Sequence, residues 1–168
     1  MQRGLGVVNG HWIQVKDGNH NAFDIFSRHY SFYHYTDNRR SNINYPQRRL
    51  ICGPGEKMVL LGQDGKSLFV WRKFIDKSGQ SGVNCAVFRN EGKELSSDLI
   101  IQAEQLAIDK WGLPIRFYTY VNQIAVKSSN PGYCYKVAGW GECGRTKTRG
   151  LVILSKSMDI STNCLSPV

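Results

Sequence analysis

The stretch VNCAVFRNEGKELSSDLIIQAEQLAIDKW, residues 83–111, decides which fold the chain can adopt. It begins with a short apolar run of the kind found in buried strands, made by Val83, Cys85, Val87 and Phe88. The polar turn NEGK follows. Ser96 and Ser97 come next, and we expect them to cap a helix, because a hydroxyl accepts hydrogen bonds from first-turn amides.

The second half of this stretch has the apolar spacing of a helix. Residues three and four apart form one face, made by Leu99, Ile100, Ala103, Leu106, Ala107 and Trp111. Gly112 and Pro114 are typical of a helix end. A strand that leads into a helix N-terminus presents free amides and the positive end of the helix dipole, which suit a phosphate or pyrophosphate. The pattern is equally typical of a strand–helix unit that binds nothing.

Length and composition indicate one globular domain. The 168 residues are 41% hydrophobic and 21% charged, enough for a proper core, and we expect a single domain over 1–157 with a flexible tail at 158–168. No apolar run approaches the ~18 residues of a membrane span. The segment MQRGLGVVNG lacks the apolar centre of a signal peptide, so we expect a cytoplasmic protein with no membrane partner.

Charge and cysteine usage narrow the partners. The formal net charge is +9, which favours binding to polyanions such as nucleic acids. The cysteines are odd in number and form no CxxC pair, which favours free thiols and argues against a closed zinc site: Cys52, Cys85, Cys134, Cys143 and Cys164.

Further elements follow from periodicity and turn signals. We expect a strand in 6–16 and then a helix, capped by Asn19 or Asn21, with His29 and Tyr30 on its apolar face. Asp64-Gly65 predicts a hairpin inside a three-stranded antiparallel meander over 57–89. The remaining expected elements are a strand at 115–122, a short helix at 132–140 and a strand or hairpin within 142–156.

This element order resembles the GNAT acyltransferase superfamily. The resemblance rests on the strand–turn–helix of 83–111 and on NPGYCYKVAGWGECG at 130–144, which is similar to the late helix of that family. It implies an α/β fold of the α+β mixed-sheet kind, with a central, mostly antiparallel sheet flanked by helices. It also implies acetyl-CoA or another acyl-CoA-like donor as co-substrate.

More narrowly, the chain is similar to the phage Mom-type DNA-modification proteins. The similar features are His29-Tyr30, GPGEKMVLL at 53–61, LFVWRKF at 68–74 and the NPGYCYK segment. This resemblance implies an adenine base of phage DNA as acceptor, location in the host cytoplasm and a metal ion, iron, near His29. Such proteins carry an acidic residue after the fifth strand; Asn122 stands at the matching position, so the mechanism does not transfer directly.

The expected donor site lies around residues 88–97. The family carries an (Arg/Gln)-x-x-Gly-x-(Gly/Ala) loop before the central helix; Arg89 and Gly92 match its first spacing, whereas Glu94 replaces a small residue and Glu91 adds negative charge. The candidate donor-binding residues are Phe88, Arg89, Asn90, Gly92, Ser96, Ser97 and Asn130. We expect the amides of Ser96 and Ser97 to face an open cleft beside Phe88.

Acyl transfer to an amine needs a polarised carbonyl, an amine that loses a proton and a thiolate that gains one. Backbone amides at 88–90 can polarise the carbonyl. The resemblance implies that a helix tyrosine protonates the thiolate; Tyr133 and Tyr135 diverge by about 200° on a helix, and we favour Tyr135. The other catalytic candidates are His29, as base or metal ligand, Tyr30 and Asn122. Each of these side chains could equally be a packing residue.

Two basic segments suggest a nucleic-acid surface. The polar loop 36–49 carries four arginines, and alternation along a strand would place Arg145, Lys147 and Arg149 on one face. The expected nucleic-acid-binding residues are Arg39, Arg40, Arg48, Arg49, Arg145, Lys147 and Arg149. Tyr33 or Tyr35 could stack on a flipped base. The alternative is a set of unrelated, solvated surface charges.

Three functions are compatible with these patterns. The first is a GNAT-like transferase that modifies an amine of DNA. The second keeps the enzyme but changes the acceptor to tRNA or a small amine. The third is a nucleic-acid-binding module without enzymatic activity on a degenerate GNAT scaffold.

Overall fold

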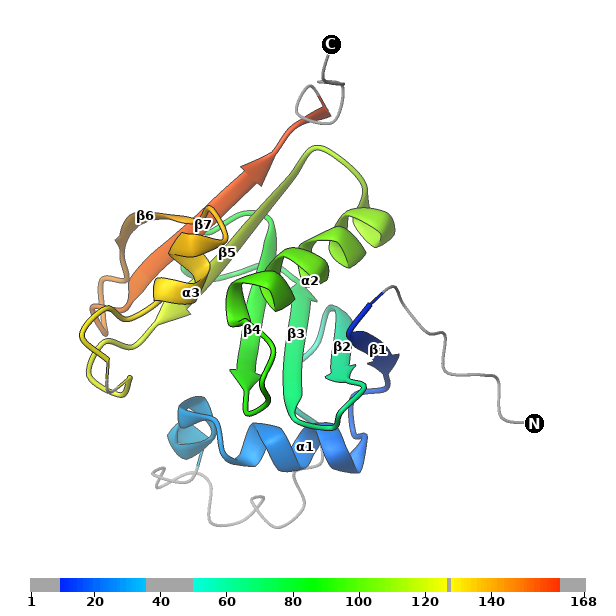
Figure 1. The fold of residues 1–168 in the computed structure, drawn as a ribbon. Helices are drawn as coiled ribbons and strands as arrows, with labels where there is room; N and C mark the ends of the chain where they lie inside the picture. The colour runs from blue at the N-terminus through cyan, green and yellow to red at the C-terminus, as the bar shows by residue number, and fades with distance from the viewer. Residues whose placement is uncertain (1–9, 36–49, 127, 161–168) are drawn as a thin grey trace.

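The computed structural model describes residues 10–35, 50–126 and 128–160, which build one central sheet with helices on both faces (Figure 1). The strands are β1 (Trp12–Val15), β2 (Glu56–Gly62), β3 (Ser67–Lys73), β4 (Val83–Asn90), β5 (Ile115–Val121), β6 (Gly141–Arg145) and β7 (Val152–Met158). The helices are α1 (His20–Ser27), α2 (Ser96–Trp111), α3 (Tyr133–Val137) and the 3-10 helix η1 (Tyr30–Tyr35).

The seven strands form a single mixed sheet in the order β1-β2-β3-β4-β5-β7-β6. Neighbouring strands are antiparallel except β4 and β5, which are parallel. The predicted meander is confirmed as β2, β3 and β4, and β6 and β7 form an antiparallel hairpin. The expected α+β class with a mostly antiparallel sheet is therefore correct.

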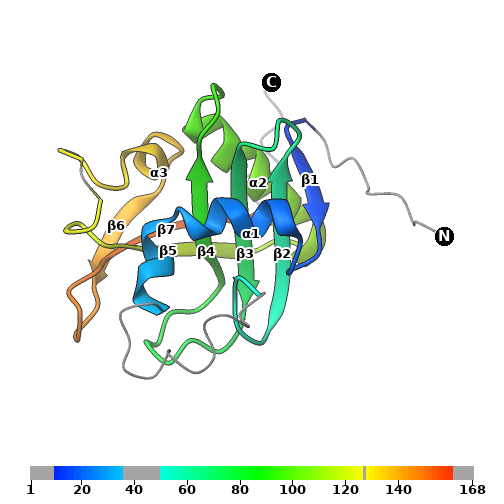
Figure 2. The ribbon, with the colours of Figure 1, turned by 90° about the horizontal axis from the view of Figure 1, so that it is seen from below.

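Helices cover opposite faces of this sheet (Figure 2). α1 packs on one face, against Val59, Leu61, Leu68 and Val70 of β2 and β3. α2 packs on the other face through Leu99, Ile100, Ala103, Leu106 and Ala107, as its periodicity predicts. In the described parts of the chain, no helix combines the length and apolarity that crossing a membrane requires.

Two buried tryptophans fix the position of α2. The indole N–H of Trp12 donates to the carbonyl of Leu99 (3.0 Å), and that of Trp71 donates to the carbonyl of Ala103 (2.8 Å). Both rings are fully buried, so their N–H groups need such partners. β1 and β3 thereby hold the helix in one register over the sheet.

A bulge interrupts β4 at Ala86. Val70 pairs with Val87, whereas the next residue of β3, Trp71, pairs with Cys85, so Ala86 is the extra residue. The bulge reverses the alternation of side chains along the strand. Cys85 belongs to the core beneath α2, whereas Val87 belongs to the core beneath α1.

β4 and β5 separate soon after they begin. Between these two fully described strands, pairing covers Val83 with Phe117 and Asn84 with Tyr118. β4 pairs with its other neighbour, β3, from Asn84 to Asn90, so beyond Asn84 its pairing continues on the β3 side alone. Alternate residues of a strand point their N–H and C=O groups to opposite edges. Part of the β4 backbone beyond Asn84 therefore faces the gap between β4 and β5.

Three predicted element boundaries were wrong. α1 ends at Ser27 with Arg28 as C-cap, so His29 and Tyr30 lie outside it. The N-cap of α2 is Leu95, with no side-chain cap, because the Ser96 hydroxyl accepts from Asn90 Nδ2 (3.0 Å) instead. Of the strand expected at 6–16, the structure shows Trp12–Val15 as a strand and Gly10 and His11 as a turn, whereas residues 6–9 lie outside the described part.

Candidate functional site

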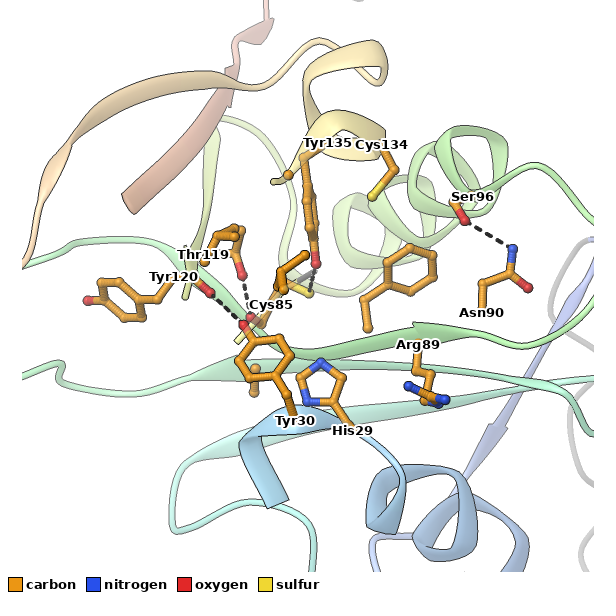
Figure 3. A pocket seen from close by; sticks show the side chains of 15 residues that line it. His29, Tyr30, Cys85, Arg89, Asn90, Ser96, Thr119, Tyr120, Cys134 and Tyr135 are labelled. Carbon is orange, nitrogen blue, oxygen red and sulfur yellow. Dashed lines mark hydrogen bonds between the residues drawn. The ribbon is translucent and has the colours of Figure 1, made fainter. Parts of the chain in front are cut away.

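A cleft of about 300 Å³ opens where β4 and β5 separate (Figure 3). Its walls come from β4, β5, the first turn of α2, α3 and the segment after α1. Its lining includes His29, Tyr30, Phe88, Arg89, Ser96 and Tyr135. We call it the β4–β5 cleft. Its position beside Phe88 agrees with the cleft expected from the sequence.

The structure separates the two candidate tyrosines of α3. Tyr135 is buried and lines the cleft, whereas Tyr133 is 60% exposed on the outer side of the helix. The Tyr135 hydroxyl lies 3.3 Å from the Cys85 Sγ (Figure 3). Burial raises the pKa of Tyr135 well above its usual value of 10, so the phenol keeps its proton at neutral pH. Tyr135 is therefore the better placed proton donor.

Thr119 marks the point where the strands part. Its hydroxyl donates to the Cys85 carbonyl (2.9 Å) across the gap, in place of a backbone bond between the strands. Thr119 is buried and was not among the candidates from the sequence. A signal was present, because it is the polar member of an alternating face made by Ile115, Phe117, Thr119 and Val121.

Asn90 shapes the loop that leads from β4 to α2. Its amide nitrogen donates to the Glu94 carbonyl (2.6 Å) and to the Ser96 hydroxyl, and its Oδ1 accepts from the Gly92 amide (3.0 Å). The first-turn amides of Ser96 and Ser97 cannot bond within their own helix. Ser96 lines the cleft, whereas Ser97 is buried beside it.

The Glu91 carboxylate, which the sequence placed near the donor phosphates, is held by two arginines. Arg28 reaches it with two bonds, at 2.8 and 2.7 Å, and Arg89 with one, at 2.7 Å. The hydrogen bond from Arg28 is the largest influence that lowers the Glu91 pKa to about 2. This clamp ties the end of α1 to the β4–α2 loop and neutralises the negative charge.

The clamp predicts an acid-sensitive contact. Glu91 has a depressed pKa, so the stability that it contributes is present above its ordinary value of 4.5 and is lost as the pH falls toward 2. Replacing Arg28 with alanine is expected to move the Glu91 pKa upward toward 4.5, as measured by NMR titration of its carboxyl carbon. Ser27→Ala, a neighbouring change that leaves both arginines in place, is the control. An unchanged Glu91 pKa in Arg28→Ala would contradict the clamp.

His29 and Tyr30 reach the cleft although they lie outside α1. Their rings are 4.4 Å apart at 30°, and the Tyr30 hydroxyl contacts the Tyr120 carbonyl at 3.4 Å. The Ser31 amide donates to His29 Nδ1 (3.2 Å), which places the ring proton of neutral His29 on Nε2. Burial, aided by the charge of Arg89, lowers the His29 pKa to about 4. His29 is thus neutral with its lone pair engaged, which argues against the roles of base and metal ligand.

Two asparagine candidates lie away from the cleft lining. The Asn122 side chain accepts from the amides of Ile124 and Ala125 and stabilises a turn. Asn130 was expected to open α3, but the helix begins at Tyr133 after Gly132, and the exposed Asn130 side chain accepts from Lys136 Nζ (3.2 Å). Neither contact suggests catalysis or donor binding.

The structure describes three of the seven predicted nucleic-acid-binding residues, Arg145, Lys147 and Arg149. Arg39, Arg40, Arg48 and Arg49 lie outside the described residues, as do the side chains of Tyr33 and Tyr35. The predicted alternation at 145–149 was wrong, because β6 ends at Arg145 and residues 147–149 form a turn. Arg149 nevertheless lies near enough to Tyr30 for its charge to lower that residue's pKa, against the larger raising effect of burial.

The iron expected by resemblance finds no matching donor set among residues 10–35, 50–126 and 128–160. In that part of the chain, no three His, Cys, Asp or Glu side chains gather in a way that could hold a metal ion. His29 itself has Nδ1 engaged by Ser31.

Comparison with known proteins adds no relative. No family model matches the chain, and no curated protein or solved structure matches it. The fold therefore defines the protein as an α+β protein with a seven-stranded, mostly antiparallel sheet, three α-helices and a cleft at the parallel strand pair.

Proposed function

We propose that the chain is a GNAT-like transferase that moves an acyl group from acyl-CoA or a related donor to an amine of a nucleic acid, with an adenine of phage DNA, as in Mom-like modification, as the preferred acceptor. The observation that carries the proposal is the split between β4 and β5. This split joins the N-terminus of α2 to a buried tyrosine hydroxyl within one cleft.

The two ends of the cleft suit the two ends of a thioester donor. Ser96, Asn90 and Arg89 line one part, where amides and a guanidinium favour phosphate groups. Phe88 and Tyr135 line another part and contact each other, with ring centres 6.1 Å apart. When bound, the donor supplies an activated acyl group. The chain holds it, and β4 amides that face the gap can stabilise negative charge on its carbonyl oxygen.

Tyr135 carries out both proton transfers of the proposed reaction. The acceptor nitrogen forms a bond to the acyl carbon and the carbon–sulfur bond breaks. The leaving thiolate takes the hydroxyl proton of Tyr135, and the proton released by the nitrogen returns to Tyr135. Cys85 is no rival nucleophile, because burial raises its pKa to about 12.

Nucleic acid as the acceptor is supported by charge. The chain carries +9, and Arg149 and Arg89 act on the cleft from different elements. A nucleic-acid strand is a polyanion, which such a surface attracts. A flipped base would enter between Tyr30 and the β6–β7 hairpin.

Donor binding is the first test. Acetyl-CoA is expected to bind the full chain in calorimetry, and Val126→Trp, which fills the cleft, should weaken binding at least tenfold. Ile124→Trp is the matched control, because Ile124 lies in the same loop but is 94% exposed and outside the lining. If acetyl-CoA fails to bind the unaltered chain, the donor assignment is wrong.

Acceptor identity needs a second experiment. Expression in a bacterial host, followed by nuclease digestion and mass analysis, should show a base with added mass in DNA. If tRNA gains an acyl group and DNA is unchanged, the acceptor is tRNA rather than DNA. DNA binding without any donor binding would favour the module without enzymatic activity.

A further inference from the structure

The β3–β4 loop, residues 74–82, is fixed against β5 by side-chain hydrogen bonds. Asp76 Oδ2 accepts from the hydroxyls of Tyr118 (2.9 Å) and Tyr120 (2.8 Å). Asp76 Oδ1 accepts from an amide and a hydroxyl within the loop, at 2.9 and 2.7 Å. Near the end of the loop, Arg116 of β5 donates to a backbone carbonyl (2.7 Å). The loop is therefore pre-organised before any partner binds.

Ile75 projects into solvent from this fixed loop. Its side chain is 95% exposed, whereas both of its neighbours are held in place. The Arg72 guanidinium lies 3.7 Å above the centre of the Phe74 ring, and Asp76 is bonded to β5. A single exposed isoleucine is ordinary by itself. Here it is held outward by a rigid loop, so it can fill an apolar space in a partner without an ordering cost.

Two hollows flank Ile75, which belongs to the lining of both. The first, of about 560 Å³, contains Arg72 and Lys77. The second, of about 550 Å³, contains Lys73 and Glu56, which lie opposite each other in the β2–β3 pairing. The positive charge is therefore concentrated on the side of the first hollow.

The carboxylates near these hollows are engaged by other groups. Asp76 lines both hollows, but its oxygens accept the four hydrogen bonds described above. Glu56 accepts from the indole N–H of Trp111 (3.0 Å). Among the described residues, neither Arg72 nor Lys77 forms an ion pair with a carboxylate. The first hollow thus has two cations against one hydrogen-bonded carboxylate, which favours an anionic partner.

A partner that fits this surface must offer an apolar interior beside an anionic border. The minor groove of DNA, about 6 Å wide, combines both, because its stacked bases lie between two rows of phosphates. Aliphatic side chains that enter this groove separate neighbouring bases and kink the duplex. Complementarity of charge and shape therefore favours a DNA duplex over a protein as the occupant.

We propose that the β3–β4 loop binds the minor groove of a DNA duplex, with Ile75 inserted between stacked bases and with Arg72 and Lys77 on the adjacent phosphates. This binding surface goes beyond the transfer reaction, because it can hold a duplex whether or not a donor is bound. The loop is also bonded to Tyr120, which lines the β4–β5 cleft. A duplex that is unstacked by Ile75 would thus lie beside the cleft, where a base is extruded at lower cost.

Unstacking of DNA tests the inserted side chain. The probe is a set of duplexes that carry 2-aminopurine, an adenine analogue whose fluorescence rises when it is unstacked, at successive positions. The protein background is Val126→Trp, which fills the cleft and keeps an extruded base from contributing. In this background the fluorescence of at least one probe should rise on binding. Ile75→Ala should abolish most of the rise and weaken the Kd by roughly tenfold, since it removes buried methyl groups.

Conservative and matched variants separate insertion from general damage. Ile75→Leu keeps an aliphatic side chain and should keep the fluorescence rise. Ile101→Ala shortens a half-exposed isoleucine of α2, outside both hollows, and should change neither the rise nor the Kd. An unchanged rise in Ile75→Ala overturns the proposal. Probes that stay dark at every position also overturn it, and a protein would then be the better candidate partner for the loop.

The salt dependence of binding tests the phosphate contacts. Lys77→Gln should reduce the slope of log K against log salt by about one, the contribution of a single phosphate contact. Lys66→Gln is the matched control, because Lys66 is an exposed lysine just before the opposite end of β3. It should leave the slope unchanged. Equal slopes for Lys77→Gln and the unaltered chain would contradict the contact in the first hollow.

The loop proposal and the transfer function fail separately. If acetyl-CoA does not bind, the transfer function is removed, whereas unstacking by Ile75 is still measured with DNA alone. If acetyl-CoA binds and DNA is acylated, but Ile75→Ala leaves unstacking and the Kd for DNA unchanged, the transferase stands and the loop proposal is wrong.

Discussion

Replacing Tyr135 with phenylalanine is expected to lower kcat by roughly 100- to 10,000-fold, the usual contribution of a positioned acid–base group. The ring packs against Phe88 and Trp140, and phenylalanine keeps those contacts. The hydroxyl touches Cys85 Sγ, a weak partner, so the fold should survive its loss. The Kd for acetyl-CoA should change little, because the proton is needed after binding.

Tyr133→Phe is the matched control for this experiment. Tyr133 begins the same short helix but is 60% exposed and absent from the cleft lining. It should retain full activity. Equal loss in both variants would point to damage to α3, and full activity of Tyr135→Phe would remove Tyr135 from the mechanism.

Replacing Glu104 with alanine is expected to destabilise the fold by about 3–5 kcal/mol, the range for breaking a buried ion pair from one side. Glu104 is 3% exposed and accepts from Trp140 Nε1 (2.6 Å) and from Lys156 Nζ (2.8 Å). Without the carboxylate, the indole N–H loses its partner and the ammonium keeps the Ala138 carbonyl alone. Urea unfolding followed by circular dichroism measures the loss.

Two control variants distinguish the stability lost with the Glu104–Lys156 ion pair from the stability lost by any substitution in α2. Asp109→Ala removes a carboxylate from the exposed side of α2, which bonds Gln105, and should cost less than about 1 kcal/mol. The double variant Glu104→Leu with Lys156→Met removes both charges and should be more stable than Glu104→Ala. If Glu104→Ala unfolds no more easily than Asp109→Ala, the buried pair does not join α2 to β7 as described.

Local patterns predicted most of the elements. Alternation and the Asp64-Gly65 turn predicted the meander, and the spacing from Leu99 to Trp111 predicted the buried face of α2. Helix geometry also predicted that Tyr133 and Tyr135 point in different directions, and the favoured Tyr135 is the buried one. These features depend on residues close together in the chain.

Boundaries were less predictable where side chains compete with the backbone. Ser96 carries a capping hydroxyl, but Asn90, six residues earlier, donates to it. The alternating charges from Arg145 to Arg149 are typical of a strand, yet the chain turns back there to pair β6 with β7. In each case a neighbouring contact outweighs a local preference.

The sequence by itself therefore determined the order of strands and helices, the α+β class and the basic character, because these follow from periodicity and charge. Tertiary structure alone decided the bulge at Ala86, the separation of β4 from β5 and the cleft between them. It also decided the meeting of Tyr30 with Tyr135, the Glu91 clamp and the burial of Glu104. Such features depend on contacts between residues up to about a hundred positions apart, which no local pattern encodes.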